Sequence, residues 1–139
     1  MRPRTQLRPF HLLHAEAFCM LLIACMGYHL LFPHQWLLFA CLFLFPDLSL
    51  FLFMRGPSTA ASVVYNILHS YVLPACLGAL AMLLSNALFG EISLIWSCHI
   101  SFDRMLGYGL KYPFSFKFTH IQGTASHDAL VAEASSPNI

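Results

Sequence analysis

The sequence predicts an all-α, membrane-spanning four-helix bundle whose helices run up, down, up and down. Three observations support this. Of the 139 residues, 58% are apolar and only 9% are charged, whereas a soluble domain carries about 25% charged residues. Four apolar segments each approach the roughly 20 residues that cross a bilayer. Short connections join them, so neighbouring helices should be antiparallel.

The first helix is expected over residues 12–32, after a basic N-terminus at residues 1–10. No small-residue cleavage site follows the apolar run, so this segment is predicted to be a retained helix and not a removable signal peptide. The other helices are expected over residues 35–54, 58–84 and 91–108. Pro46 and Pro74 should kink the second and third helices, because proline removes a helical hydrogen bond.

The fourth helix should end at the glycines that flank Tyr108, and Pro113 prevents its resumption. The next stretch alternates apolar and polar residues, so residues 109–121 are predicted to lie along the interface and to bring His120 towards the bundle. Together, residues 11–121 would form the transmembrane domain. The tail at 122–139 is small and polar, and we expect it to be poorly ordered.

Basic residues indicate the orientation of the bundle. With four crossings, one side would hold both termini, the 55–57 loop and every Lys and Arg: Arg2, Arg4, Arg8, Arg55, Arg104, Lys111 and Lys117. The positive-inside rule then predicts that both termini are cytoplasmic. The net charge of +1 gives no case for nucleic-acid binding.

Polar residues of all four predicted helices fall at one depth, in the cytoplasmic half of the bilayer. Ionisable groups in a membrane normally face the bundle interior, and His99 and Asp103 share a helical face because they are four residues apart. We therefore expect an inward-facing cluster of Glu16, Asp47, Asn66, His69, His99 and Asp103.

Imidazoles and carboxylates in one cluster are ligands for Zn²⁺, Mn²⁺ or Fe²⁺. The predicted metal ligands are Asp47, His69, His99 and Asp103. Such a metal could activate water for hydrolysis, with Glu16 as a base or supporting group and Asn66 orienting ligands. The predicted substrate-binding residues, which would hold a phospholipid or prenyl phosphate, are Arg104, Lys111 and His120.

Several blocks of the sequence resemble a small family of bacterial integral membrane proteins, known as domain of unknown function 4260. The blocks are PDLS at Pro46–Ser49, YNILH at Tyr65–His69, HISFDRMLGYGLKYP at His99–Pro113 and FTH at Phe118–His120. Glu16 also fits the first-helix glutamate of that family. The resemblance implies a four-helix protein of the bacterial inner membrane, but no established activity.

Three functional hypotheses follow. The first is a metal-dependent hydrolase acting on a phosphorylated, lipid-like substrate. The second is a non-enzymatic bundle in which the polar network only fixes helix packing, within one chain or in a homo-oligomer. The third is a small proton-coupled carrier, for which four helices would have to pair in a homodimer. The sequence leaves open whether the chain is an enzyme.

Overall fold

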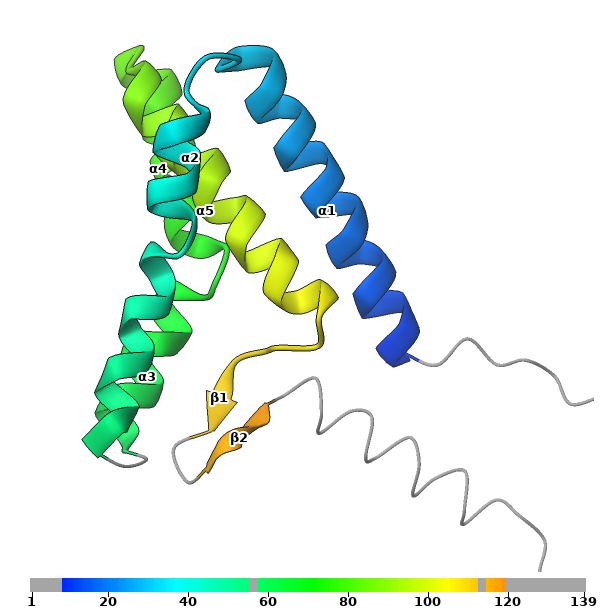
Figure 1. Ribbon diagram of the computed structural model, residues 1–139, viewed down its shortest axis with the longest axis vertical. Coiled ribbons are helices and arrows are strands. Elements are labelled where there is room, and N and C mark those ends of the chain that lie inside the picture. The colour runs from blue at the N-terminus through cyan, green and yellow to red at the C-terminus, as the bar shows by residue number, and fades with distance from the viewer. Residues whose placement is uncertain (1–8, 56–57, 113–114, 120–139) are drawn as a thin grey trace, which may run out of the picture.

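A computed structural model describes residues 9–55, 58–112 and 115–119. This part of the chain is a helical bundle with one small β-hairpin at its end (Figure 1). The predicted all-α bundle is therefore confirmed. Its elements are α1 (Pro9–Leu31), α2 (Trp36–Phe43), the 3₁₀ helix η1 (Phe45–Arg55), α3 (Thr59–Leu68), α4 (Val72–Leu84), α5 (Ala87–Met105), β1 (Lys111–Tyr112) and β2 (Ser115–Thr119).

The second and third apolar segments are each built from two helices. At Pro46, which cannot donate a backbone hydrogen bond, the chain changes from α2 to η1, and the Asp47 amide bonds the Leu44 carbonyl in 3₁₀ fashion at 3.1 Å. Pro74 lies in the first turn of α4, where no donor is required. Both prolines therefore coincide with breaks between helices, and the break before α4 leaves His69 at the end of α3.

Side-chain caps fix where two helices begin. The Ser58 hydroxyl accepts from the Ala61 amide at 3.2 Å at the start of α3, and Asn86 accepts from the Phe89 amide at 3.2 Å at the start of α5. Such caps satisfy amides that have no partner within the helix. Because of the Asn86 cap, the last helix begins at Ala87, one turn earlier than the predicted residue 91, and it ends at Met105.

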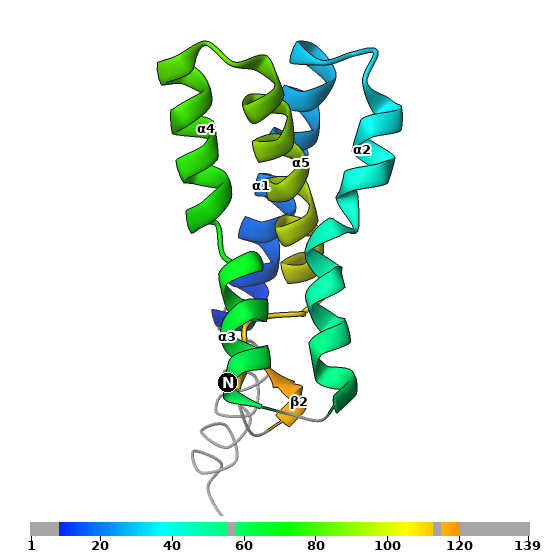
Figure 2. The ribbon, with the colours of Figure 1, turned by 90° about the vertical axis from the view of Figure 1, so that its left-hand side faces the viewer.

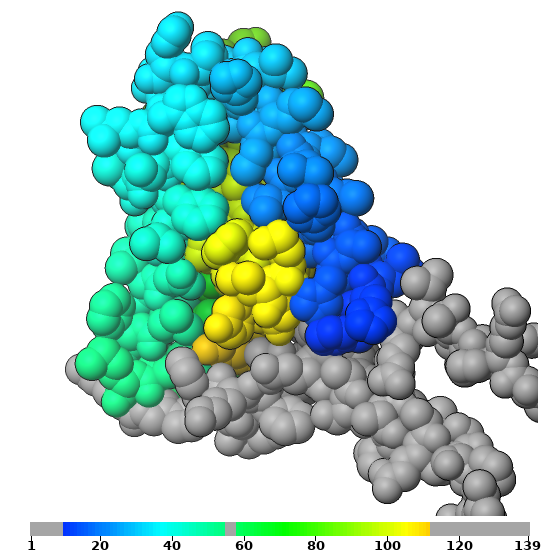
Figure 3. Space-filling view, turned by 45° about the vertical axis from the view of Figure 1, so that its right-hand side comes forward, coloured from blue at the N-terminus to red at the C-terminus, as the bar shows by residue number. Residues whose placement is uncertain are grey.

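Helix α5 packs against α1, α4 and α2. In Figure 2 it lies in the centre, between α4 and α2 and in front of α1. Seven of its residues are buried: Glu91, Ser93, Ile95, Cys98, His99, Ile100 and Ser101. On α1, the buried stripe Ala17, Ala24 and Tyr28 recurs at the spacing of one helical face. The last part of α5 reaches the surface between α1 and η1 (Figure 3).

Three segments of the described chain are long and apolar enough to cross a membrane: Phe10–Leu31, Trp36–Met54 and Thr59–Leu84. Their outer faces expose large apolar side chains, for example Leu37 at 79% and Leu83 at 82%. A water-soluble surface does not carry apolar side chains at this density. The chain is a membrane protein. The more polar α5 is not among the three segments, and it is the helix that the others surround.

After α5, Gly107 adopts the left-handed conformation at φ +89°. The chain then enters an antiparallel hairpin in which Lys111 pairs with Thr119 and Tyr112 pairs with Ser115. This hairpin falls within the segment 109–121 for which an extended conformation is expected. His120 and the tail at 122–139 lie outside the described residues.

Candidate metal centre

Three separate elements together supply four polar side chains to one point. Asp47 follows Pro46 in η1, His69 is the residue at which α3 ends, and His99 and Asp103 lie one turn apart near the end of α5. One donor atom from each of the four residues lies within 4.8 Å of the others. These are the four residues that the sequence predicts as metal ligands.

Five of the six donor–donor distances fall in a narrow range. His69 Nε2 lies 3.3 Å from His99 Nε2, 3.4 Å from Asp47 Oδ1 and 3.6 Å from Asp103 Oδ2. His99 Nε2 lies 3.6 Å from each of the same two carboxylate oxygens. A metal bound at about 2.0–2.1 Å in a tetrahedron separates neighbouring ligand atoms by about 3.3–3.4 Å. The spacing of the donors therefore fits a small divalent cation.

Hydrogen bonding fixes the tautomer of His69. Its Nδ1 lies 3.0 Å from the carbonyl oxygen of Tyr65, which can only accept, so Nδ1 carries the proton. In the neutral ring, Nε2 then presents a lone pair to the centre of the cluster. This is the arrangement of a metal-binding histidine whose second nitrogen is held by a backbone carbonyl.

Aromatic rings hold both imidazoles in place. The His69 ring stacks on the Tyr65 ring with centroids 3.8 Å apart and planes 12° apart. The His99 ring meets the Phe43 ring edge-on at 5.4 Å. Near the end of α3, the Trp96 indole donates to the Leu68 carbonyl at 2.7 Å and so ties that end to α5. Such support limits how far the donor atoms can drift.

The four ligands differ in exposure. The His69 and His99 side chains are 4% and 1% exposed, whereas Asp103 is 17% and Asp47 is 35% exposed. The cluster is therefore closed on its imidazole side and most accessible beside Asp47. Any solvent or ligand would approach the centre from the carboxylate side.

Arg104 lies beside the cluster. Its Nη2 donates to the His69 carbonyl at 3.4 Å, and its guanidinium carbon lies 5.7 Å from the centre of the Tyr71 ring. With His69 and Asp103, it lines a narrow crevice that Tyr65 and Tyr108 complete. The crevice brings a guanidinium next to two of the candidate metal ligands.

Lys111 is buried beside Tyr65, the residue whose ring stacks on His69. Its ammonium nitrogen lies 4.6 Å from the centre of the Tyr65 ring and 5.0 Å from that of Phe53, which is cation–π geometry. Burial lowers the pKa of this ammonium, while the charges of Asp47 and Asp103 act in the opposite direction. Lys111 thus lies within electrostatic reach of the two carboxylates.

The Asn66 side chain bonds the backbone of Lys111. Its amide oxygen accepts from the Lys111 amide at 2.7 Å, and its amide nitrogen donates to the Lys111 carbonyl at 2.9 Å. This pair of bonds attaches β1 to α3. Asn66 therefore positions Lys111, and its predicted role in orienting the metal ligands stays a prediction.

Glu16 also lies apart from the four ligands. Its side chain is exposed, and it lines a separate cavity together with Arg104 and Tyr71. The neighbouring Ala17 takes the inward position on α1. Of the remaining candidates, Arg104 and Lys111 lie near the cluster, and His120 falls outside the described residues.

No sequence pattern indicates that Phe43 supports the His99 ring, that Trp96 ties the end of α3 to α5 or that Tyr71 lies beside Arg104. Aromatic residues are abundant in this chain, so their identity gave no signal. The only hint lay in Tyr65, whose spacing of four residues from His69 predicts a shared helical face.

The family model of a domain of unknown function, DUF4260, matches residues 11–124. The chain belongs to this family. The match includes all four candidate metal ligands and agrees with the resemblance found in the sequence blocks. No curated protein and no solved structure matches the chain. Family membership therefore identifies the protein's relatives, and any function must be argued from the geometry of the site.

Proposed function

We propose that this protein binds one divalent metal ion through Asp47, His69, His99 and Asp103. The observation that supports this is the set of five donor–donor distances between 3.3 and 3.6 Å. Nitrogen and carboxylate ligands at this spacing suit Zn²⁺ first, and Mn²⁺ or Fe²⁺ with added oxygen ligands.

Charge balance supports a cation in this place. Two ionised carboxylates carry two negative charges, which one divalent ion neutralises. Without the ion, protons would have to lie between these donor atoms, because the Nε2 lone pair of His69 faces His99 Nε2 at 3.3 Å and Asp47 Oδ1 at 3.4 Å. Buried charges in a bilayer are costly unless they are paired. A neutral metal cluster meets this requirement.

With the orientation expected from the sequence, this centre would lie in the cytoplasmic half of the bacterial inner membrane. Helix α1 begins and α5 ends at the same end of the bundle (Figure 1). Arg104 and Lys111 belong to that end, and the sequence adds Arg2, Arg4 and Arg8 just before α1. The positive-inside rule assigns such an end to the cytoplasm.

The chemistry we assign to the centre is hydrolysis of a phosphorylated, lipid-like substrate. A bound divalent metal lowers the pKa of a coordinated water and so supplies a nucleophile near neutral pH. The chain's own groups would bind the substrate. Arg104 would hold the phosphate next to Asp103, and Lys111 would contribute positive charge near the two carboxylates. Accessibility beside Asp47 gives the water a route to the centre.

A second function is favoured by a different observation. All four ligands come from the protein, and the crevice beside His69 and Asp103 is narrow. Structural zinc sites are closed in this way, whereas catalytic sites keep a position open. In this alternative, the bound metal holds η1, α3 and α5 together and catalyses no reaction.

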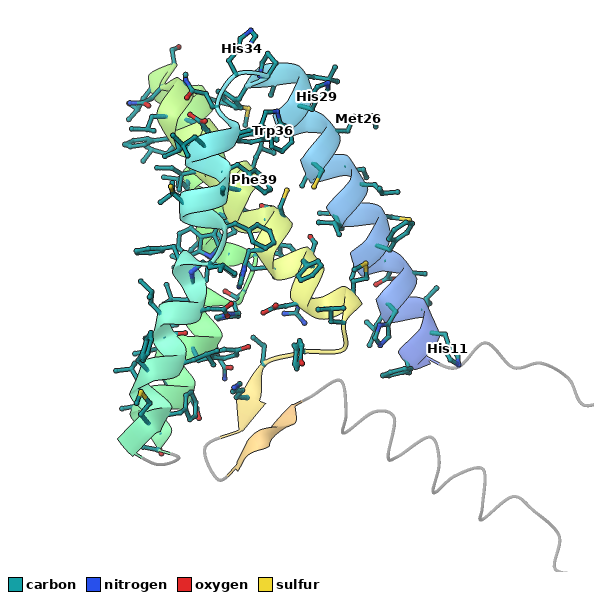
Figure 4. All side chains as sticks on the ribbon, in the orientation of Figure 1. His11, Met26, His29, His34, Trp36 and Phe39 are labelled. Carbon is teal, nitrogen blue, oxygen red and sulfur yellow. The ribbon has the colours of Figure 1, made fainter. Side chains whose placement is uncertain are left out.

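Elemental analysis of detergent-purified protein tests the metal centre. We expect about one metal ion per chain, and a loss of most of it in His69→Ala and in His99→Ala. His11→Gln and His34→Gln are matched controls, because both side chains are exposed at opposite ends of the protein, away from the cluster (Figure 4). The proposal is overturned if no metal binds at stoichiometry, as purified or after reconstitution.

An activity assay separates the two functions. Metal-loaded protein is incubated with short-chain phospholipids, and the released headgroup and phosphate are measured. Hydrolysis that needs the metal and disappears in His99→Ala supports the enzyme. Stoichiometric metal without any turnover supports the structural centre.

A further inference from the structure

A cavity of about 240 Å³ lies between the first turns of α1 and the end of α5. Four residues of one α1 face line it, together with two residues from the other side: Leu13, Glu16, Ala17, Met20, Tyr71 and Arg104. The cavity thus holds a carboxylate and a guanidinium among apolar side chains. Neither the metal centre nor the helix packing accounts for this combination.

Arg104 is shared by this cavity and by the crevice beside the metal centre. In the crevice it lies next to His69 and Asp103, and in the cavity it lies next to Glu16 and Tyr71. Its Nη2 donates to the His69 carbonyl and its guanidinium lies over Tyr71, so the side chain is held between the two spaces. An anion bound by Arg104 would lie between the candidate metal ligands and Glu16.

Glu16 adds a carboxylate to the cavity, whose charge is opposite to that of the Arg104 guanidinium. Its exposed carboxylate would attract a cation and repel a ligand that is only anionic. The α1 residues Leu13, Ala17 and Met20 add an apolar wall beside it. The cavity therefore presents a site for a positive group, a site for phosphate and a surface for hydrocarbon.

We propose that this cavity binds the zwitterionic headgroup of a phospholipid, with its phosphate on Arg104 and its ammonium on Glu16. A lipid of the phosphoethanolamine type has this chemistry, and a prenyl phosphate or an anionic phospholipid lacks the cation. Glu16 lies about 10 Å along α1 from its start at 1.5 Å per residue, which is within the outer third of a hydrocarbon core about 30 Å thick. The headgroup would therefore be drawn into the cavity from the nearby membrane surface.

That this lipid is the substrate rests on the proposed function; that it binds here does not. Binding can therefore be measured with the metal removed. Because Glu16 is exposed and Arg104 contacts the His69 backbone, Glu16→Gln is the variant that changes the cavity with the least effect on the metal ligands.

The test uses the full chain in detergent and short-chain probes, with dissociation constants from calorimetry, both with and without a metal chelator. Dihexanoylphosphatidylethanolamine should bind more tightly than dihexanoylphosphatidylglycerol, which has the same phosphodiester without an amine. In Glu16→Gln, binding of the ethanolamine lipid should weaken about fivefold, the upper range for an exposed ion pair, and binding of the glycerol lipid should not weaken. Arg104→Gln should weaken both.

Two controls sharpen the measurement. His11→Gln lies on the same helix outside the cavity and should bind both lipids as wild type does. Free O-phosphoethanolamine should bind more weakly than the lipid, because it has no chains to contact Leu13, Ala17 and Met20. Equal affinity for the free headgroup would overturn the assignment to a lipid.

The outcomes separate this inference from the proposed function. Equal affinity of the wild type for the two lipids, or an unchanged preference in Glu16→Gln, overturns the headgroup site even when metal is bound at stoichiometry. If the protein binds no metal but still prefers the ethanolamine lipid in a way that depends on Glu16, the headgroup site is supported. Only the proposed metal centre is then overturned.

Discussion

His69 and His99 face each other through their Nε2 atoms at a distance of 3.3 Å, although one ends α3 and the other lies in α5. The proton that His69 donates to the Tyr65 carbonyl leaves a lone pair on its Nε2. Two imidazole nitrogens and two carboxylate oxygens therefore converge on one point. The following predictions test what this convergence does.

Metal should stabilise the folded protein. A ligand that binds only the folded state at a hundred times its Kd adds about 2.7 kcal/mol, so chelation should lower the midpoint of thermal unfolding in detergent. His34→Gln should respond to the chelator as wild type does. An unfolding midpoint that is indifferent to both chelator and added Zn²⁺ would count against the metal centre.

His99→Gln and Asp103→Asn distinguish a metal centre from a packing network. Both substitutions keep hydrogen-bonding groups, and membrane hydrogen bonds average only about 0.6 kcal/mol. We therefore expect each variant to lose the metal-dependent part of its stability and to unfold near the wild-type midpoint once metal is removed. A large loss of stability in metal-free protein would instead support the packing network.

Asn66→Ala should detach β1 from α3. The substitution removes two hydrogen bonds to the Lys111 backbone, and buried groups left without partners cost about 1–3 kcal/mol. Thermal unfolding in detergent measures the loss. Asn66→Asp keeps the acceptor for the Lys111 amide and should lose less.

The same variant checks the role of Asn66. Metal content should remain near one ion per chain in Asn66→Ala, because Asn66 bonds the Lys111 backbone and not a metal ligand. If metal is lost while stability is unchanged, the role predicted from the sequence, orienting the ligands, is correct.

Tyr28→Phe should weaken the opposite end of the bundle. The single hydroxyl proton of Tyr28 lies within reach of two acceptors, the Gln35 carbonyl at 2.7 Å and the Glu91 carboxyl at 2.8 Å, and both Tyr28 and Glu91 are buried. Loss of the hydroxyl leaves these acceptors without their donor, at a cost of about 1–3 kcal/mol. Thermal unfolding checks this, with Tyr108→Phe as an exposed control. Equal effects of the two substitutions would contradict this prediction.

The composition and spacing of the sequence were sufficient to predict the helical bundle, because apolar runs and short connections leave few other arrangements in a bilayer. They also predict which two residues share a face of the last helix, since His99 and Asp103 are four residues apart. The four candidate ligands could be chosen from residue type and depth alone.

The direction in which each side chain points around its helix axis could be learned only from the tertiary structure. Asn66 has the same depth as His69 but bonds the backbone of β1, a strand 45 residues further along the chain. Glu16 is exposed and lines the cavity beside Arg104, apart from the four ligands, while α1 packs Ala17, Ala24 and Tyr28 inwards. Depth follows from counting residues, whereas rotation about a helix axis is set by packing against other helices.

The sequence by itself therefore determined a membrane bundle and the set of polar groups that it must accommodate. The tertiary structure decided which of these groups meet, because Pro46 breaks the second segment and the turn before Val72 breaks the third. These breaks aim Asp47 and His69 at α5, where His99 and Asp103 already share a face. Contacts between residues distant in sequence fix such directions, and no local pattern encodes them.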